Sequence, residues 1–267
     1  MEDIGCIEPE AGEDPLELLH RCGGLYMCPK ASDGKRLGPL VGYAGRYKPD
    51  NLQFVGDIYA NFAMAEMHPL VMQCYAMSLV EMFPADLRID CFCAMPMGGI
   101  TFAVHLGLTE CKQVIFLEKK VVALKTETER EKSVLVAVRH EIKAGVRYAL
   151  VEDVTNNFST TLTAIELIRN AKGVVAAIVS ILNRSPGHQG RYRVPDKDPA
   201  KDVDLPIISV VSQPFPEWKQ DDPAVAQDIA AGNVVHKPKD GWPVLMKAME
   251  DAKALSHEPE TVQSRCV

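Results

Sequence analysis

The residue types best suited to ligand chemistry are concentrated in one stretch, Ala149–Thr161, which reads ALVEDVTNNFSTT. A short apolar run ends in two adjacent carboxylates, Glu152 and Asp153, and hydroxyl and amide side chains then lead into a predicted helix. Carboxylates accept hydrogen bonds from neighbouring sugar hydroxyls, and the unpaired backbone N–H groups at the start of a helix bind phosphate. The pattern therefore indicates a site for a sugar phosphate. Its candidate phosphate-binding residues are Thr155, Asn156, Asn157, Phe158, Ser159, Thr160 and Thr161.

A structural interpretation of the same stretch stays open. Glu152 and Asp153 can simply mark the end of a strand, and Thr160 can serve as the N-cap of the following helix. Two acids directly after a buried strand are nevertheless hard to explain by packing, because a buried charge is costly without a partner.

A second loop, Met95–Ile100, also leaves a predicted strand and enters a predicted helix. Its residues Met97, Gly98 and Gly99 can expose backbone amides to an anion, since glycine has no side chain to keep a ligand away. Glycine also marks ordinary tight turns, so this loop carries weight mainly through its position one strand before the acid pair.

The elements that must position these loops form a repeating pattern. Apolar strands are predicted over residues 89–95, 114–117, 148–151 and 174–182, and helices over 66–83 and 160–172. Strands that are apolar throughout and alternate with helices predict an α/β fold, with a mostly parallel sheet flanked by helices on both faces. Such a sheet binds ligands at the carboxyl ends of its strands. Cys91 and Cys93 alternate in one strand and are expected to be buried, reduced thiols.

Three segments are predicted along the chain. Residues 1–50 are rich in glycine, proline and charge and are expected to be an irregular or capping segment. The expected boundaries are 1–55 for this N-terminal capping segment and 56–213 for the core. Residues 214–267 are expected to form a C-terminal extension packed on the core, with short helices near 224–231 and 242–255.

Composition restricts the class of protein. The 267 residues are 47% hydrophobic and 24% charged, as in ordinary globular proteins, and the formal net charge of -7 comes without a dense block of Lys and Arg. Small anionic ligands therefore fit better than nucleic acid. No apolar run approaches the roughly 20 residues that span a bilayer, so no membrane association is expected. The acidic first thirty residues are unlike a targeting peptide, and a cytoplasmic location is expected.

On these motifs the chain resembles the type I phosphoribosyltransferases, and within them the orotate phosphoribosyltransferases. Their fingerprint is four apolar residues, two acids, an apolar residue and a Thr/Gly/Ser-rich loop that holds the 5-phosphate of phosphoribosyl pyrophosphate. Glu152, Asp153, Val154, Asn157, Thr160 and Thr161 stand in matching places. The chain departs from the family at Phe158, where the family has glycine, and this divergent phosphate loop puts the usual close backbone approach in doubt.

The resemblance assigns expected roles to further residues. Met97, Gly98, Gly99 and Lys119 would bind the diphosphate; Lys119 matches a family lysine, while Glu118 replaces the preceding arginine. Lys125 would be the flap lysine of a mobile segment between Lys119 and Arg147, with Arg139 and His140 as alternatives. The sequence itself slightly favours a solvated hairpin or helix for this segment. Arg184, Tyr59 and Asn156 would lie beside the base. The expected catalytic residues are Glu152, Asp153, Lys119 and Lys125.

The resemblance implies a pentosyltransferase that moves phosphoribosyl from phosphoribosyl pyrophosphate to a nucleobase, with orotate favoured by Arg184, in pyrimidine nucleotide synthesis. It also implies Mg²⁺ on the diphosphate, reaching Asp153 only through the substrate, and a homodimer. The alternative is a non-catalytic protein of the same fold that senses a nucleotide or phosphoribosyl pyrophosphate, and Phe158 is the feature that favours it.

Overall fold

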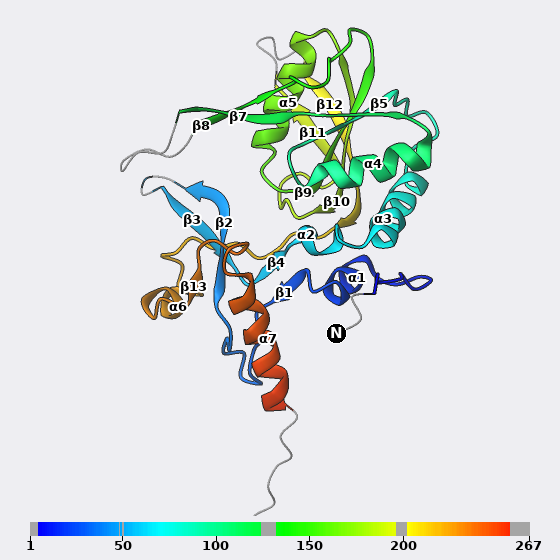
Figure 1. Cartoon of the computed structure of the whole chain (residues 1–267). Coiled ribbons are helices and arrows are strands. Elements are labelled where there is room, and N and C mark those ends of the chain that lie inside the picture. The colour runs from blue at the N-terminus through cyan, green and yellow to red at the C-terminus, as the bar shows by residue number, and fades with distance from the viewer. Residues whose placement is uncertain (1–4, 48, 50, 124–131, 196–201, 257–267) are drawn as a thin grey trace, which may run out of the picture. The chain divides into compact units, whose positions relative to one another are not determined.

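The computed structural model describes residues 5–47, 49, 51–123, 132–195 and 202–256 (Figure 1). Its contacts divide the chain into two compact units. The first, here called the sheet unit, comprises Met1–Gly24 and Phe62–Phe215; the second, called the terminal unit, comprises Leu25–Asn61 and Pro216–Val267. Residues 216–267 thus share a unit with residues 25–61, and the packing of 214–267 on the core stays a prediction.

The sheet unit is built on a six-stranded sheet with the strand order β11-β12-β10-β9-β5-β6. Neighbouring strands run parallel from β12 to β6, and β11 alone is antiparallel. This confirms the predicted α/β fold with a mostly parallel sheet. The strands are β5 (Cys91–Ala94), β6 (Gln113–Phe116), β9 (Arg147–Thr155), β10 (Val174–Asn183), β11 (Arg191–Val194) and β12 (Val203–Ser212).

Helices cover both faces of this sheet. Figure 1 shows α3 (Pro69–Glu81) and α4 (Gly99–Glu110) on one side and α5 (Ser159–Asn170) on the other. Alternate strand residues point to opposite faces. Cys91 and Cys93 therefore face the α5 side, where they are buried in the same apolar cluster as Ile165 and Ile168. Both cysteines are free thiols, as predicted.

Several predicted boundaries move because pairing between strands decides them. The predicted strand 148–151 continues to Thr155, since Glu152, Val154 and Thr155 pair with β10. The acid pair therefore lies inside β9, near its carboxyl end, rather than beyond the strand. The predicted helix 66–83 begins only at Pro69, a residue favoured at a first helical position, and is preceded by the short α2 (Phe62–Ala65). The strands β11 and β12 were not predicted.

The alternative that residues 1–50 are irregular was wrong, while their role as a capping segment stays a prediction. The N-terminal part of the chain contains α1 (Pro15–Arg21), β1 (Leu25–Met27), β2 (Leu40–Tyr47) and β3 (Leu52–Gly56). The Asp14 carboxylate accepts the backbone N–H groups of Leu16 and Glu17 and so caps α1. Glycine and proline occur here both between these short elements and within them, as at Pro15 of α1 and at Gly42 and Gly45 of β2.

An antiparallel hairpin leaves the sheet after β6. Its strands are β7 (Glu118–Ala123) and β8 (Lys132–Val136), with Lys119 paired to Leu135. The described part of the segment between Lys119 and Arg147 is thus a hairpin and not a helix.

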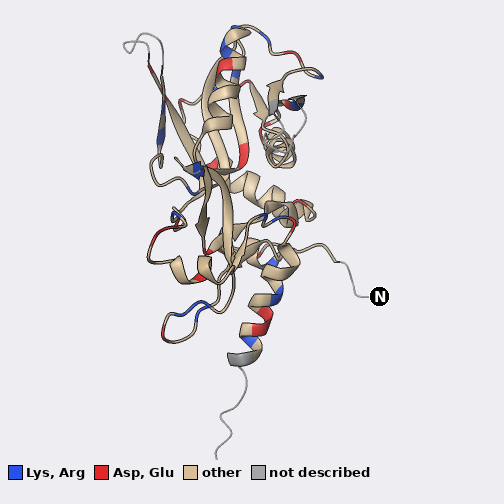
Figure 2. Ribbon diagram, turned by 90° about the vertical axis from the view of Figure 1, so that its left-hand side faces the viewer, with Lys and Arg blue, Asp and Glu red and all other residues tan. Residues whose placement is uncertain are grey.

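The terminal unit joins segments from both ends of the chain. The strand β13 (Val234–Val235) extends the β2–β3 hairpin, and β1 pairs with β4 (Ile58–Ala60). The backbone of Trp218 exchanges two hydrogen bonds with Val55, of 2.8 and 2.9 Å. The helices here are α6 (Ala226–Ala230) and α7 (Trp242–Ser256), close to the predicted positions. Basic and acidic residues alternate along α7 (Figure 2), where Lys247 pairs with Asp251 at 3.1 Å.

Among the residues described, no helix combines the length and the apolar character needed to cross a membrane.

Candidate functional site

The acid pair lies at the carboxyl end of the sheet. Glu152 and Asp153 stand on β9, between β10 and β5, and both are partly buried. Burial, together with the charge of Asp153, raises the pKa of Glu152 to about 8, and the nearby charge of Lys119 offsets part of this effect. Near neutral pH the Glu152 carboxyl is therefore largely protonated, and it can donate a hydrogen bond as well as accept one.

The loop between β5 and α4 touches the acid pair. A Cβ placed on Gly98 would lie 2.2 Å from Oδ2 of Asp153, and one placed on Gly99 would lie 2.2 Å from the carbonyl oxygen of Val151. Both separations are far below any non-bonded contact, so a side chain at Gly99 would overlap the backbone of β9, and one at Gly98 would require the Asp153 side chain to move. The two predicted ligand loops are thus in direct contact, although they are distant in sequence.

The loop after β9 has an unexpected backbone. Phe158, the residue just before α5, adopts φ 55° and ψ 13°, which is the left-handed region. Its ring is 3% exposed and belongs to the apolar cluster on the α5 face. The doubt about Phe158 was that it restricts positive φ and close approach; here the residue takes the positive φ, and its ring lies in the core instead of over the loop.

Polar side chains of the same loop have mixed surroundings. The amide oxygen of Asn157 accepts the backbone N–H of Ser159 at 3.2 Å and its hydroxyl at 3.0 Å. Asn157 thereby satisfies one N–H at the start of α5. Thr161 is buried, Thr160 and Asn156 are partly buried, and Ser159 is exposed.

A row of buried hydroxyl groups runs across the sheet from Thr155, where the loop begins. The Thr155 hydroxyl lies 3.3 Å from that of Ser180, which in turn lies 2.8 Å from that of Ser209. All three side chains are buried, on β9, β10 and β12. Sequence reasoning missed Ser180 and Ser209; a polar residue inside an otherwise apolar strand such as VVAAIVSIL was the available signal.

The remaining predicted residues are placed as follows. Arg184 follows β10, is 9% exposed and donates its backbone N–H to the Thr155 carbonyl at 3.0 Å, so it lies beside the loop. Lys119 is exposed on β7, and Met97 is 81% exposed. Tyr59 is on β4 of the terminal unit, with its ring 6.1 Å from that of Trp242. Lys125 lies outside the described residues.

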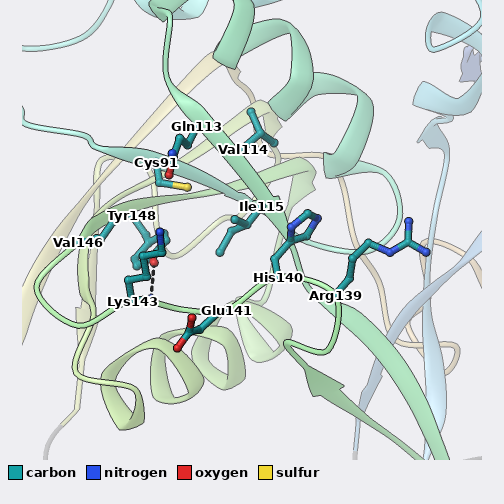
Figure 3. Close-up of a pocket in the computed structure, with 10 residues that line it drawn as sticks. All are labelled: Cys91, Gln113, Val114, Ile115, Arg139, His140, Glu141, Lys143, Val146 and Tyr148. Atoms are coloured by element: carbon teal, nitrogen blue, oxygen red, sulfur yellow. Dashed lines mark hydrogen bonds between the residues drawn. The ribbon is translucent and has the colours of Figure 1, made fainter.

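A cavity of about 410 Å³ lies elsewhere in the sheet unit (Figure 3). Cys91, Gln113 and Tyr148, at or next to the amino ends of β5, β6 and β9, help to line it, together with His140 and Lys143. The backbone N–H of Lys143 donates to the Tyr148 hydroxyl at 2.8 Å. Because the acid pair is at the carboxyl end of β9, this cavity is a separate feature.

The chain is similar in sequence to several known proteins. An orotate phosphoribosyltransferase of Erythrobacter litoralis is 28% identical over 162 residues, which covers 60% of this chain and 72% of the relative. A second, from Methanospirillum hungatei, is 25% identical over 130 residues, covering 49% of this chain and 69% of the relative. The chain resembles orotate phosphoribosyltransferases. No model of a known protein family matches it.

A solved orotate phosphoribosyltransferase, from Aeropyrum pernix, aligns over 73% of this chain and 92% of its own, with 16% identity and a TM-score of 0.48. The similarity to the two orotate phosphoribosyltransferase relatives is a similarity of sequence. The fold class follows from the strand order and helix placement described above.

Proposed function

We propose that this protein is a phosphoribosyltransferase, which transfers a phosphoribosyl group from phosphoribosyl pyrophosphate to a ring nitrogen of a nucleobase. The observation that carries the proposal is the contact between Gly98 and the Asp153 carboxylate. It joins a loop with exposed backbone to a pair of carboxylates at the carboxyl end of a parallel sheet, where such folds bind ligands. The sequence similarity to orotate phosphoribosyltransferases supports the same reaction class.

In this proposal each part of the site holds one part of the substrate. Glu152 and Asp153 bind the two ribose hydroxyls, and the protonated Glu152 donates to one of them. The Met97–Gly99 backbone and Lys119 receive the diphosphate. Thr155–Thr161 and the start of α5 receive the 5-phosphate. Lys125, in its expected role as flap lysine, would assist at the diphosphate.

The reaction breaks the bond between C1 of the ribose and the diphosphate oxygen. The electron pair leaves with the diphosphate, C1 gains oxocarbenium character, and the base nitrogen then bonds to C1 and releases its proton to water. Lys119 stabilises the charge that grows on the leaving group. Orientation of the ribose by the acid pair keeps C1 facing the base, which lowers the entropic part of the barrier.

Magnesium is the cofactor proposed. Mg²⁺ commonly keeps several waters and binds mainly through substrate phosphates rather than in a complete protein cage, and the Asp153 carboxyl beside the Met97–Gly99 backbone fits an ion held on the diphosphate. When bound, the ion neutralises charge on the diphosphate. Asp153 would meet it only through the substrate.

Orotate is the base proposed. The backbone N–H of Arg184 donates to the carbonyl of Thr155, the first residue of the proposed phosphate loop. The planar, forked guanidinium of Arg184 suits a planar carboxylate. Asn156, in the loop itself, is proposed to lie beside the base as well. An orotate substrate would place the protein in pyrimidine nucleotide synthesis, as a cytoplasmic enzyme.

A homodimer is proposed as the assembly. The paired helices α3 and α4 expose several large apolar side chains, which a second copy can cover. These residues are Leu70, Met77, Val104 and Leu108. Light scattering on the purified chain measures the mass directly, and a monomer at micromolar concentration would contradict this part of the proposal.

The reaction is tested by incubating the protein with phosphoribosyl pyrophosphate, Mg²⁺ and a panel of bases while pyrophosphate release is followed. We expect release with orotate. Asp153→Asn should abolish it while the circular dichroism spectrum and melting temperature stay unchanged, and unchanged activity would remove the ribose-binding role. Binding of phosphoribosyl pyrophosphate without turnover for every base would instead support the sensor alternative.

A further inference from the structure

Phe158 is one of three aromatic rings packed together. Its ring is stacked on that of Tyr192, with centroids 4.8 Å apart and planes inclined by 15°. The His188 ring meets both of them edge-on, at 5.3 Å from Phe158 and 5.1 Å from Tyr192. Tyr192 lies on β11 and is 8% exposed. The phosphate loop is therefore attached, through one side chain, to the antiparallel edge strand.

This attachment falls where the backbone most needs support. A residue other than glycine is strained in the left-handed region, so Phe158 keeps φ 55° only if its surroundings hold it there. The Phe158 side chain makes no N-cap hydrogen bond, and the α5 helix begins at the next residue. The direction of the first N–H groups of α5 therefore depends on the Phe158 backbone.

The segment that carries His188 is held by hydrogen bonds of its own. The Asn183 amide donates to the carbonyl of His188 at 2.6 Å, and the backbone N–H of His188 donates to the Ser185 hydroxyl at 3.2 Å. These bonds hold the backbone of His188 within the 183–189 connection. The 183–189 connection and β11 thus supply the two rings, His188 and Tyr192, that contact Phe158. Arg184 is their only predicted site residue.

We propose that Tyr192 is a positioning residue for the 5-phosphate of the substrate. It acts through Phe158: the stacked ring holds the left-handed backbone, and this backbone aims the N–H groups at the start of α5 toward the phosphate. The inference rests on the proposed function and adds to it a residue on β11. Stacking uses the ring of Tyr192 and not its hydroxyl, so phenylalanine should replace it.

The competing explanation is that Tyr192 only fills the core. In that case its removal lowers stability but does not act on phosphate binding through the Phe158 backbone. A double-mutant cycle separates the two, because glycine adopts positive φ without support. If Tyr192 is needed to hold Phe158, it becomes dispensable for phosphate binding once residue 158 is glycine.

The experiment uses the full chain with Tyr192→Leu, Tyr192→Phe, Phe158→Gly and the double variant Phe158→Gly/Tyr192→Leu. Leucine keeps an apolar side chain at residue 192 but cannot stack, which protects the fold better than alanine. We expect Tyr192→Leu to raise KM for phosphoribosyl pyrophosphate and Kd for ribose 5-phosphate by about tenfold, the loss that corresponds to about 1.4 kcal/mol, with kcat little changed. Tyr192→Phe should match the wild type, and Tyr192→Leu should have no further effect in the Phe158→Gly background. An equal loss in both backgrounds would overturn the proposal.

A readout that needs no ligand keeps this test apart from the proposed function. The backbone N–H of Leu162 donates to the Phe158 carbonyl at 2.8 Å, so its hydrogen exchange reports the first turn of α5. We expect faster exchange at Leu162 in Tyr192→Leu and the wild-type rate in Tyr192→Phe. Unchanged exchange in Tyr192→Leu would refute the positioning role even if the enzyme is active. If exchange is faster in Tyr192→Leu but the wild-type chain binds no ribose 5-phosphate, the phosphate role and the proposed function are refuted, while the link from Tyr192 to Phe158 stands.

Discussion

Two loops enter helices at the same edge of the sheet, and they meet a similar demand in different ways. In the loop before α4, Gly98 and Gly99 are needed for space, because a Cβ at either position would overlap Asp153 or the Val151 carbonyl. In the loop before α5, the demand is for a left-handed backbone, and Phe158 meets it with a ring buried against Tyr192.

The difference shows that glycine serves two separable purposes in ligand loops. Space beside a neighbouring backbone cannot be supplied by any larger residue. A positive φ can be adopted by a larger residue, provided that packing offsets about 1–2 kcal/mol of strain. A family pattern that asks for glycine therefore does not say which of the two is required.

The largest expected effect tests the packing side of this comparison. Phe158→Ala keeps the left-handed strain and loses the buried ring, so we expect the free energy of unfolding to fall by about 3–5 kcal/mol in urea denaturation. Phe158→Gly loses the same ring but also the strain, and it should be about 1 kcal/mol more stable than Phe158→Ala. Equal stability of the two variants would argue against strain at residue 158.

The space side is tested next by Gly99→Ala. The added Cβ meets the carbonyl of Val151, a backbone atom on a central strand that has little freedom to move. We expect a loss of about 1–3 kcal/mol in the free energy of unfolding. Gly145→Ala is a useful contrast, because that glycine has open space around it and a φ of 78°, so only strain should appear there. A neutral Gly99→Ala would contradict the close approach.

A pH effect at the acid pair should be of intermediate size. The folded-state pKa of Glu152 is about 8 and the ordinary value is 4.5, so the folded protein holds the proton more tightly. Its contribution to stability is complete below about pH 4.5, declines as the pH rises toward 8 and is absent above it. We expect the wild type to lose about 1–2 kcal/mol more than Glu152→Gln between pH 6 and 9, since partial exposure reduces the full linkage value. Urea titrations of both proteins at the two pH values measure this difference. An identical change in the free energy of unfolding for wild type and Glu152→Gln would show that the Glu152 pKa is not raised.

The smallest effect on stability is expected for Gly98→Ala, although the function should suffer. Here the added Cβ meets the carboxylate of Asp153, a side chain that can rotate away, so stability should change by about 0.5 kcal/mol or less. The displaced carboxylate should lower pyrophosphate release by about 100-fold, as expected when a reacting group shifts by about 1 Å. Full activity together with an intact fold would mean that Asp153 does not need its observed position.

The sequence by itself determined the class of the fold and the order of the two ligand loops. Apolar strands that alternate with helices specify a covered parallel sheet, and the acid pair follows the run Ala149–Val151 in a way that packing alone does not explain. These are local patterns, and local patterns can be recognised without knowing the neighbours.

Only the tertiary structure decided what the key residues touch. The extension of β9 to Thr155 depends on pairing with β10, the need for Gly98 depends on Asp153, and the tolerance of Phe158 depends on Tyr192. Each of these is a steric or packing relation between segments far apart in the chain. The spacing of apolar residues indicates which face of an element a residue occupies, but not which distant atom it contacts. That contact decides whether a given backbone conformation or close approach is stable.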